Sequence, residues 1–145
     1  MKRLLCDSML GRLARWLRLL GWDAPLLARP PLRLAPGEVL LTRRRRLAGR
    51  PGVILVEHDQ VAGQLVQVVK ELGLEIRPGA MFTRCLDCNR PVEPVSRDEV
   101  MGLVPDYTLH TAPGFTRCPD CGKVFWPGSH GQRARQRLQE MLGRA

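Results

Sequence analysis

The chain has 145 residues, of which 44% are hydrophobic, 12 are Pro and 14 are Gly. This length fits one domain, or a small domain that carries a second module, and the apolar content excludes wholesale disorder. No apolar run approaches the roughly 18 residues that cross a bilayer, so we expect no membrane partner.

Positive charge is concentrated at one end of the sequence. The formal net charge is +9, and residues 1–50 hold 12 basic and 3 acidic residues, whereas residues 51–145 hold 11 of each. Arg supplies 20 of the 23 basic residues. Because the guanidinium group binds phosphate bidentately, this composition favours a nucleic-acid partner; a compositional bias with ordinary solvated Arg side chains is an equal alternative.

A strand at residues 3–6 and a helix at residues 9–20 open the predicted fold. Asp7 and Ser8 lie between them and are expected to cap the helix. Apolar side chains recur on one side of this helix at Leu10, Leu13, Leu17 and Leu20. The opposite side carries basic residues that we expect to face solvent, namely Arg12, Arg15 and Arg18. Gly21 is placed to end the helix.

Three further strands are predicted at residues 24–27, 39–42 and 53–56, and a second helix follows Asp59, which is expected to cap it. The side of that helix expected to face solvent carries Gln64, Gln67, Lys70 and Glu71. Strands that alternate with helices predict a mostly parallel sheet. Functional side chains of such sheets gather where the strands end, and this sequence places there Asp7, Arg43, Arg44, Glu57 and Asp59.

Two Cys-x-x-Cys pairs, Cys85 with Cys88 and Cys118 with Cys121, predict a zinc ribbon in the second half of the chain. Each pair forms a knuckle that presents two thiolates, and two knuckles complete a tetrahedral shell around one zinc ion. Two disulfides, which need an oxidising compartment, or a redox pair are the alternatives. With four Cys ligands the zinc keeps no open position for catalysis, so we expect a structural role.

The segments around the knuckles are short. Ser96 and Glu99 have the spacing of a capping box, residues 107–110 are predicted as a strand, and a last helix is predicted at about residues 131–143. The acid-poor, Arg-rich start of the chain is also typical of an organelle transit peptide. The strand-then-helix pattern there favours the first unit of a folded domain instead, so we expect an unprocessed, cytoplasmic protein.

Several motifs together resemble one known family. Residues 6–18 (CDSMLGRLARWLR), followed by GWD at 21–23, are similar to the opening of the Mut-seven C-terminal RNase domain family. The likeness continues in shorter motifs: LLTR at 40–43, QL at 64–65, FTRC at 82–85, CN at 88–89, Phe115, CPDCG at 118–122 and WPGSH at 126–130. It covers nearly the whole chain, and the combination is specific although each motif alone is weak.

The resemblance implies a PIN-type α/β nuclease fold joined to a zinc ribbon, with metal-dependent RNA cleavage as the activity. Such cleavage uses several carboxylates at strand ends to hold Mg²⁺ or Mn²⁺. Asp7 fits the first carboxylate position. The family's LLTR strand usually continues with Asp, but this chain has Arg44 there, and a proline-bearing stretch replaces an acidic helix of the family. Replacing a carboxylate by the guanidinium of Arg44 changes the local charge from −1 to +1, which disfavours a divalent ion and attracts phosphate.

The sequence therefore predicts a PIN-like α/β domain at residues 1–79, in which helices flank the sheet, and a zinc ribbon with a C-terminal helix at residues 80–145. Zn is the expected structural ion. The favoured function is RNA binding by an RNase-family protein whose nuclease site is degraded. The expected RNA contacts are Arg12, Arg15, Arg43, Arg44, Arg45, Arg46 and His130.

Two other functions stay open. The first is an active Mg- or Mn-dependent ribonuclease that uses Asp7 with a makeshift set of carboxylates drawn from Asp23, Glu57 and Asp59. The second is a zinc-ribbon module that docks an unidentified protein, with the basic face incidental. For His130 and Trp126, RNA contact competes with structural roles, since His130 can cap the last helix and Trp126 can cover the core of the ribbon.

Overall fold

Four short parallel strands form the larger of two sheets in the computed structural model, which describes residues 2–143. The strands are β1 (Arg3–Asp7), β2 (Leu26–Leu27), β3 (Glu38–Thr42) and β4 (Val53–Leu55). Their order across the sheet is β2-β1-β3-β4, so the first strand of the chain lies inside the sheet. The predicted parallel sheet is confirmed, and the strands predicted at residues 3–6, 24–27, 39–42 and 53–56 overlap β1 to β4 in turn.

Three helices share one hydrophobic core with one face of this sheet: α1 (Gly11–Leu19), α2 (Val61–Leu72) and α4 (Ser129–Gly143). Leu13 and Leu17 of α1 are fully buried there, as is Leu65 of α2. Burying a side chain of this size stabilises the fold by about 1.5–3 kcal/mol. The opposite face of the sheet packs against a smaller apolar cluster, which contains Leu40 and Leu47 and lies beneath loops.

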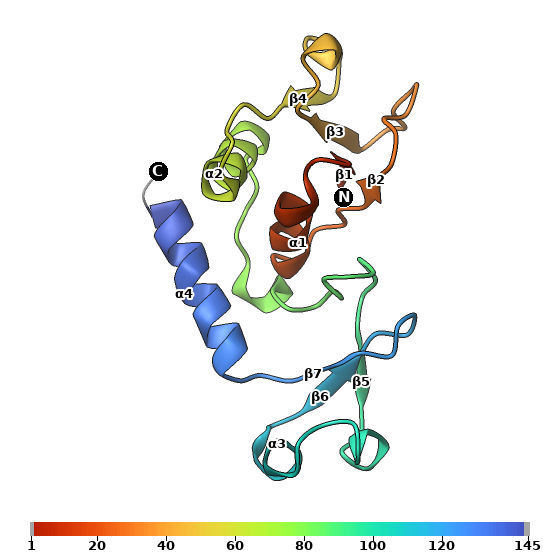
Figure 1. Ribbon diagram of the computed structural model, residues 1–145, viewed down its shortest axis with the longest axis vertical. Coiled ribbons are helices and arrows are strands. Elements are labelled where there is room, and N and C mark those ends of the chain that lie inside the picture. The colour runs from red at the N-terminus through yellow and green to blue at the C-terminus, as the bar shows by residue number, and fades with distance from the viewer. Residues whose placement is uncertain (1, 144–145) are drawn as a thin grey trace.

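The last helix returns to the α/β part of the molecule after the ribbon. Leu138 and Met141 of α4 lie in the same core as α1 and α2, and Figure 1 shows α4 alongside α2. The predicted C-terminal helix is thus confirmed, and the predicted division after residue 79 stays a prediction. Among residues 2–143, no helix combines the length and the apolar character needed to cross a membrane.

The ribbon is a second, antiparallel sheet with its own small core. Its strands are β5 (Glu93–Val95), β6 (Phe115–Arg117) and β7 (Val124–Phe125), in the order β5-β6-β7. The segment between β5 and β6 holds a 3-10 turn, η3 (Asp98–Val100), and a short helix, α3 (Asp106–Thr111). The predicted strand at residues 107–110 is therefore wrong. Asp106 lies in the first turn of the helix, where its negative charge interacts favourably with the helix dipole, and Pro105 lies just before it at the N-cap, where its missing N–H costs no helical hydrogen bond.

Two capping predictions are also wrong. Leu10 occupies the N-cap position of α1 and Gln60 that of α2, and neither helix has a side-chain cap. The carboxylates of Asp7 and Asp59 bind arginine side chains instead. The Ser96 hydroxyl accepts a hydrogen bond from the Glu99 N–H at 3.3 Å, as the capping box predicts.

Two polar side chains that were predicted to face solvent are buried. Arg18 is 8% exposed and Gln64 is 7% exposed. The reason is the same in both cases, because each side chain donates to a backbone carbonyl of a neighbouring segment. Arg18 Nε reaches the oxygen of Ala24 at 2.9 Å, and Gln64 Nε2 reaches that of His58 at 2.9 Å.

Gly21 allows the chain to leave α1 and pass close to the start of the ribbon. Its φ is +97°, and a Cβ at this position would lie 2.5 Å from the carbonyl oxygen of Ala80. We therefore expect Gly21→Ala to lower the free energy of unfolding by about 2–3 kcal/mol, as measured by urea denaturation. Gly73→Ala is the matched control, since Gly73 has a φ of +61° with no atom near its Cβ position. Equal losses for the two variants would contradict a steric role for Ala80.

Candidate functional site

Asp7 lies at the carboxyl end of β1, inside the larger sheet, and its side chain is fully buried. Because β1 and β3 are neighbours in register, Asp7 lies beside Thr42, whose hydroxyl donates to Asp7 Oδ2 at 2.7 Å. Arg44 Nε donates to the same oxygen at 2.9 Å. The backbone N–H of Ser8 donates to Oδ1 at 2.8 Å. Both carboxylate oxygens are therefore engaged by this chain's own donors.

These contacts set the ionisation of Asp7. Burial alone raises the pKa of the carboxyl group, because it disfavours the charged form. The hydrogen bonds from Thr42, Ser8 and Arg44, with the positive charge of Arg44, outweigh burial and hold the pKa of Asp7 below its ordinary value. Asp7 is consequently an ionised carboxylate at neutral pH, paired with a guanidinium.

Arg43 turns away from Asp7 toward the segment that follows β4. Its Nη2 pairs with Asp59 Oδ1 at 2.7 Å, and its Nη1 donates to the carbonyl oxygen of His58. The Asp59 side chain is 86% exposed. The structure thus places Asp59 after β4, as predicted, but its carboxylate is paired with Arg43. Glu57 is exposed on the same segment, where its backbone N–H donates to Gln67.

Asp23 lies at the other end of β1. Asp23 forms an isolated parallel bridge with Arg3. Because Arg3 is four residues before Asp7, the two ends of β1 are about 13 Å apart along the strand. Asp23 Oδ2 pairs with Arg3 Nε at 3.3 Å, and its Oδ1 accepts a hydrogen bond from Asn89 Nδ2 at 2.7 Å. The structure therefore does not bring Asp23 together with Asp7.

The remaining predicted RNA contacts differ in their surroundings. Arg12 lies on α1, and Arg45 and Arg46 lie on the 3-10 turn η1 (Arg45–Leu47) that follows β3; all three are exposed. We call these three residues the basic edge, and within residues 2–143 none of them forms an ion pair. Arg15 pairs with Asp87 of the first cysteine knuckle. His130 is exposed at the start of α4.

The four predicted metal ligands converge. The Sγ atoms of Cys85, Cys88, Cys118 and Cys121 all lie within 4.8 Å of one another. In each knuckle the residue after the second cysteine has a positive φ and donates its N–H to the carbonyl oxygen of the first cysteine. These residues are Asn89, with a φ of +62° and a bond of 2.9 Å, and Gly122, with +77° and 3.0 Å. Two matched knuckles with four thiol donors are positioned to bind a metal ion.

The first knuckle is also tied to the α/β part of the chain, which the sequence patterns did not predict. The buried guanidinium of Arg18 donates to the carbonyl oxygen of Leu86 at 2.7 Å. Asn89 accepts from the Ala24 N–H at 3.0 Å while its amide group donates to Asp23. We call these contacts the knuckle staple. The sequence does contain a signal for this contact, namely the Asn directly after a Cys-x-x-Cys pair. Asn tolerates a positive φ, and its side chain both donates and accepts hydrogen bonds.

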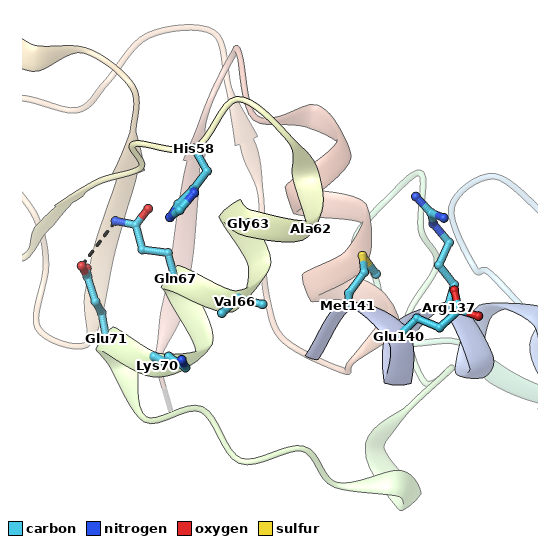
Figure 2. Close-up of a pocket in the computed structure, with 10 residues that line it drawn as sticks. All are labelled: His58, Ala62, Gly63, Val66, Gln67, Lys70, Glu71, Arg137, Glu140 and Met141. Atoms are coloured by element: carbon cyan, nitrogen blue, oxygen red, sulfur yellow. Dashed lines mark hydrogen bonds between the residues drawn. The ribbon is translucent and has the colours of Figure 1, made fainter. Parts of the chain in front are cut away.

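Two other features of the structure, a cleft and a partly exposed tryptophan, contribute no ligands to the four-cysteine cluster. A cleft of about 610 Å³ lies between α2 and α4, and Figure 2 shows His58 and Gln67 on its α2 side and Arg137 on its α4 side. Its charged side chains are mixed in sign, since Lys70 and Arg137 accompany two glutamates. On the ribbon, Trp126 packs against Phe115 with ring centroids 6.4 Å apart and remains 37% exposed.

Within the described residues, the four cysteines are the one group of three or more His, Cys, Asp or Glu side chains placed to hold a metal ion, and Asp7 belongs to no such group. Comparison with curated proteins and with solved structures gives no significant match. A family model does match, the Mut7-C RNAse domain, over residues 2–138, and this range contains β1, Asp7 and all four cysteines. The chain therefore belongs to the Mut7-C RNAse domain family.

Proposed function

We propose that this protein binds RNA through its basic edge and that the ion pair between Arg44 and Asp7 closes its nuclease site. The observation that carries the proposal is the contact of 2.9 Å between Arg44 Nε and the buried carboxylate of Asp7. Membership of an RNase domain family supports RNA as the ligand. The exposed guanidinium groups of the basic edge supply the means to bind phosphate.

Electrostatics and coordination both oppose a divalent ion at Asp7. At about 4 Å and an effective dielectric constant near 20, two unit charges interact by about 4 kcal/mol, so a guanidinium beside the carboxylate repels a divalent cation strongly. A metal ion would also have to displace the donors that Thr42 and Arg44 direct at Asp7 Oδ2. Mg²⁺ prefers about six oxygen ligands, and its protein sites usually supply more than one carboxylate.

The second candidate is an active Mg- or Mn-dependent ribonuclease. It is favoured by the ionised state of Asp7 at the carboxyl end of an interior strand. The Arg44 side chain is 33% exposed, so it has room to leave the carboxylate when a phosphate competes for it. Asp59, on the segment after β4, would then be a second carboxylate, released from Arg43 in the same way.

The four-cysteine cluster fits zinc, because zinc favours a tetrahedral set of four thiolates. We propose a structural zinc ion there. A cytoplasmic location belongs to the same proposal, since a reducing compartment keeps the four cysteines available as ligands.

A nuclease assay tests the closed site. We expect the wild-type protein not to cleave single-stranded RNA with Mg²⁺ or Mn²⁺, and Arg44→Asp to gain cleavage that the further change Asp7→Asn abolishes. The physical reason is that a second carboxylate beside Asp7 reverses the local charge and supplies a metal ligand. Binding of Mn²⁺ at 100 times its Kd should also stabilise Arg44→Asp by about 2.7 kcal/mol, which thermal denaturation reports independently of activity.

Arg43→Asp is the matched control, because it makes the same change of charge beside a solvent-exposed carboxylate. Wild-type cleavage that Asp7→Asn removes would establish the second candidate instead. If Arg44→Asp neither cleaves RNA nor gains stability from Mn²⁺, Arg44 is not what closes the site.

A binding titration tests the basic edge. We expect Arg45→Ala/Arg46→Ala to weaken binding of a fluorescein-labelled oligouridine about tenfold at low salt, as measured by fluorescence anisotropy. The slope of log K against log salt should also become shallower by about 1.4, at roughly 0.7 for each lost contact with a single strand. The charge-matched control is Arg50→Ala/Arg133→Ala, since Arg50 precedes β4 and Arg133 lies on α4. An equal loss of affinity in this control would contradict a localised RNA site.

A further inference from the structure

The contact between Arg44 and Asp7 engages only part of the guanidinium group. Within residues 2–143, the side chain of Arg44 donates one hydrogen bond, from Nε to Asp7 Oδ2 at 2.9 Å. Among the same residues no polar side-chain atom is both buried and unpaired, so Nη1 and Nη2 of Arg44 are in contact with solvent. The side chain is accordingly 33% exposed. Both terminal nitrogens are therefore left to bind a ligand.

The carboxylate that holds Arg44 is itself fixed from two sides. Asp7 is fully buried, and it accepts hydrogen bonds from the Thr42 hydroxyl at 2.7 Å and from the Ser8 N–H at 2.8 Å. The backbone of Arg44 is tied to the same group, because its N–H donates to Thr42 Oγ1 at 3.0 Å. The guanidinium is thus held through its side chain and through its backbone. A group that is ordered in advance loses less conformational entropy when it binds a ligand.

Arg43 has the opposite arrangement, although it is the neighbouring residue. Its Nη2 pairs with Asp59 Oδ1 at 2.7 Å, and its Nη1 donates to the carbonyl oxygen of His58. Both terminal nitrogens of Arg43 therefore bind the protein itself. This difference makes Arg43 a matched control for Arg44.

We infer that Asp7 is a positioning residue, which holds Arg44 as a receptor for one phosphate group of RNA at the carboxyl end of β1. A guanidinium binds phosphate through two parallel N–H donors, and Nη1 and Nη2 of Arg44 provide such a pair. The inference rests on RNA as the ligand, as proposed above, and adds that the closed nuclease site takes part in binding. It differs from the second candidate function, in which phosphate draws Arg44 away from Asp7.

A charge-matched substitution tests the receptor by fluorescence anisotropy with labelled oligouridine at low salt. Arg44→Lys keeps the positive charge and loses the paired donors. We therefore expect about fivefold weaker binding, with an unchanged slope of log K against log salt. Arg43→Lys should bind as the wild type does. Equal affinities of Arg44→Lys and the wild type would overturn the inference but leave the basic edge untouched, so the two proposals fail separately.

Asp7→Asn distinguishes positioning from charge neutralisation. The substitution removes a negative charge near the bound phosphate, so electrostatics alone predicts tighter binding. Loss of positioning predicts the reverse, and we expect binding about fivefold weaker, because the paired donors are no longer held in place. Asp59→Asn is the control, since it removes the same charge beside Arg43, and it should bind RNA at least as tightly as the wild type. Tighter binding by Asp7→Asn, with circular dichroism showing a folded protein, contradicts the positioning role.

NMR of the arginine side chains tests the same contact in the wild-type protein, with no dependence on the stability of a variant. The probe is uridine 5′-monophosphate at millimolar concentration, and uridine is the control without phosphate. We expect the nucleotide alone to shift the guanidinium signals of Arg44, while the Arg44 Nε–H stays protected from exchange with water because its bond to Asp7 persists. An unshifted Arg44, or an Nε–H that loses its protection, would refute the inference.

The phosphate can come from the end or from the interior of an RNA strand, and two oligouridines distinguish these sources. One carries a 5′-phosphate and the other a 5′-hydroxyl. Tighter binding of the phosphorylated strand that Arg44→Lys abolishes assigns a terminal phosphate to Arg44. Equal binding of both strands, with the same loss in Arg44→Lys, assigns an internal phosphodiester. If Arg44→Lys changes the affinity for neither strand, Arg44 is not a phosphate receptor.

Discussion

Removal of the metal ion from the four-cysteine cluster is expected to unfold the ribbon and also to destabilise the α/β part of the protein. The ribbon depends on the ion because its own core is small, and binding of structural zinc is worth roughly 10–16 kcal/mol in zinc-finger peptides. The α/β part is affected because the knuckle staple ties Arg18 and Asp23 to the first knuckle. Loss of that knuckle leaves a buried guanidinium without one of its acceptors.

Hydrogen exchange measured by mass spectrometry before and after chelation reports both effects. We expect faster exchange in residues 80–128 and, to a smaller extent, in α1. Asn89→Gly separates the staple from the metal site, because glycine keeps the positive φ of the knuckle while the two side-chain hydrogen bonds are lost. This variant should keep its metal ion and lose about 1–3 kcal/mol of stability. Unchanged exchange in α1 after chelation would contradict a coupling between the two parts.

Asp7→Asn is expected to lower the free energy of unfolding by about 3 kcal/mol. The substitution keeps the shape of the side chain, but it leaves Arg44 without its carboxylate and places an amide donor near other donors. Asp59→Asn is the matched control. Its ion pair with Arg43 is as short, 2.7 Å against 2.9 Å, but its side chain is 86% exposed, so the loss should be about 0–1 kcal/mol. Urea denaturation of both variants measures the contrast, and similar losses would show that burial of Asp7 does not decide the strength of its pair.

The same ion pair makes stability depend on pH in acid. The folded-state pKa of Asp7 lies below its ordinary value, so the unfolded chain binds the proton more readily. The stabilisation from Asp7 is complete above the unfolded value of about 3.9 and is lost as the pH falls through the folded value. We therefore expect wild-type Tm to fall more steeply below about pH 4 than the Tm of Asp7→Asn. Parallel curves for the two proteins would contradict an ionised Asp7 in the native state.

The long periodic elements could be predicted from the sequence because a single helix or strand determines their pattern. Leu13 and Leu17 mark the buried face of α1, and Leu65 and Val68 mark that of α2, as the spacing predicts. The sequence of α3 predicts a strand instead of a helix, since six residues carry too little periodicity to distinguish the two structures. Its identity depends on the small ribbon core, where Leu109 is buried beside Phe115.

Polar residues were harder to predict than apolar ones. Arg18 has the spacing of an exposed residue, and its burial depends on acceptors in Ala24 and Leu86, the second of which lies 68 residues away. Residue type alone groups Asp23 with Asp7. Only the register of β1 with the segment before β2 shows that the two carboxylates lie at opposite ends of one strand.

Local patterns in the sequence are enough to predict a parallel α/β sheet and four cysteines at knuckle spacing, because periodicity and ligand spacing are local properties. The sequence also places an arginine, Arg44, where the family resemblance implies an acid. The partner of that arginine depends on the tertiary structure. The pairing of β1 with β3 places Arg44 against the buried carboxylate of Asp7, whereas Arg43 beside it binds Asp59. These two neighbouring arginines bind different carboxylates, because the direction of each side chain depends on its place at the edge of the sheet and not on residue type.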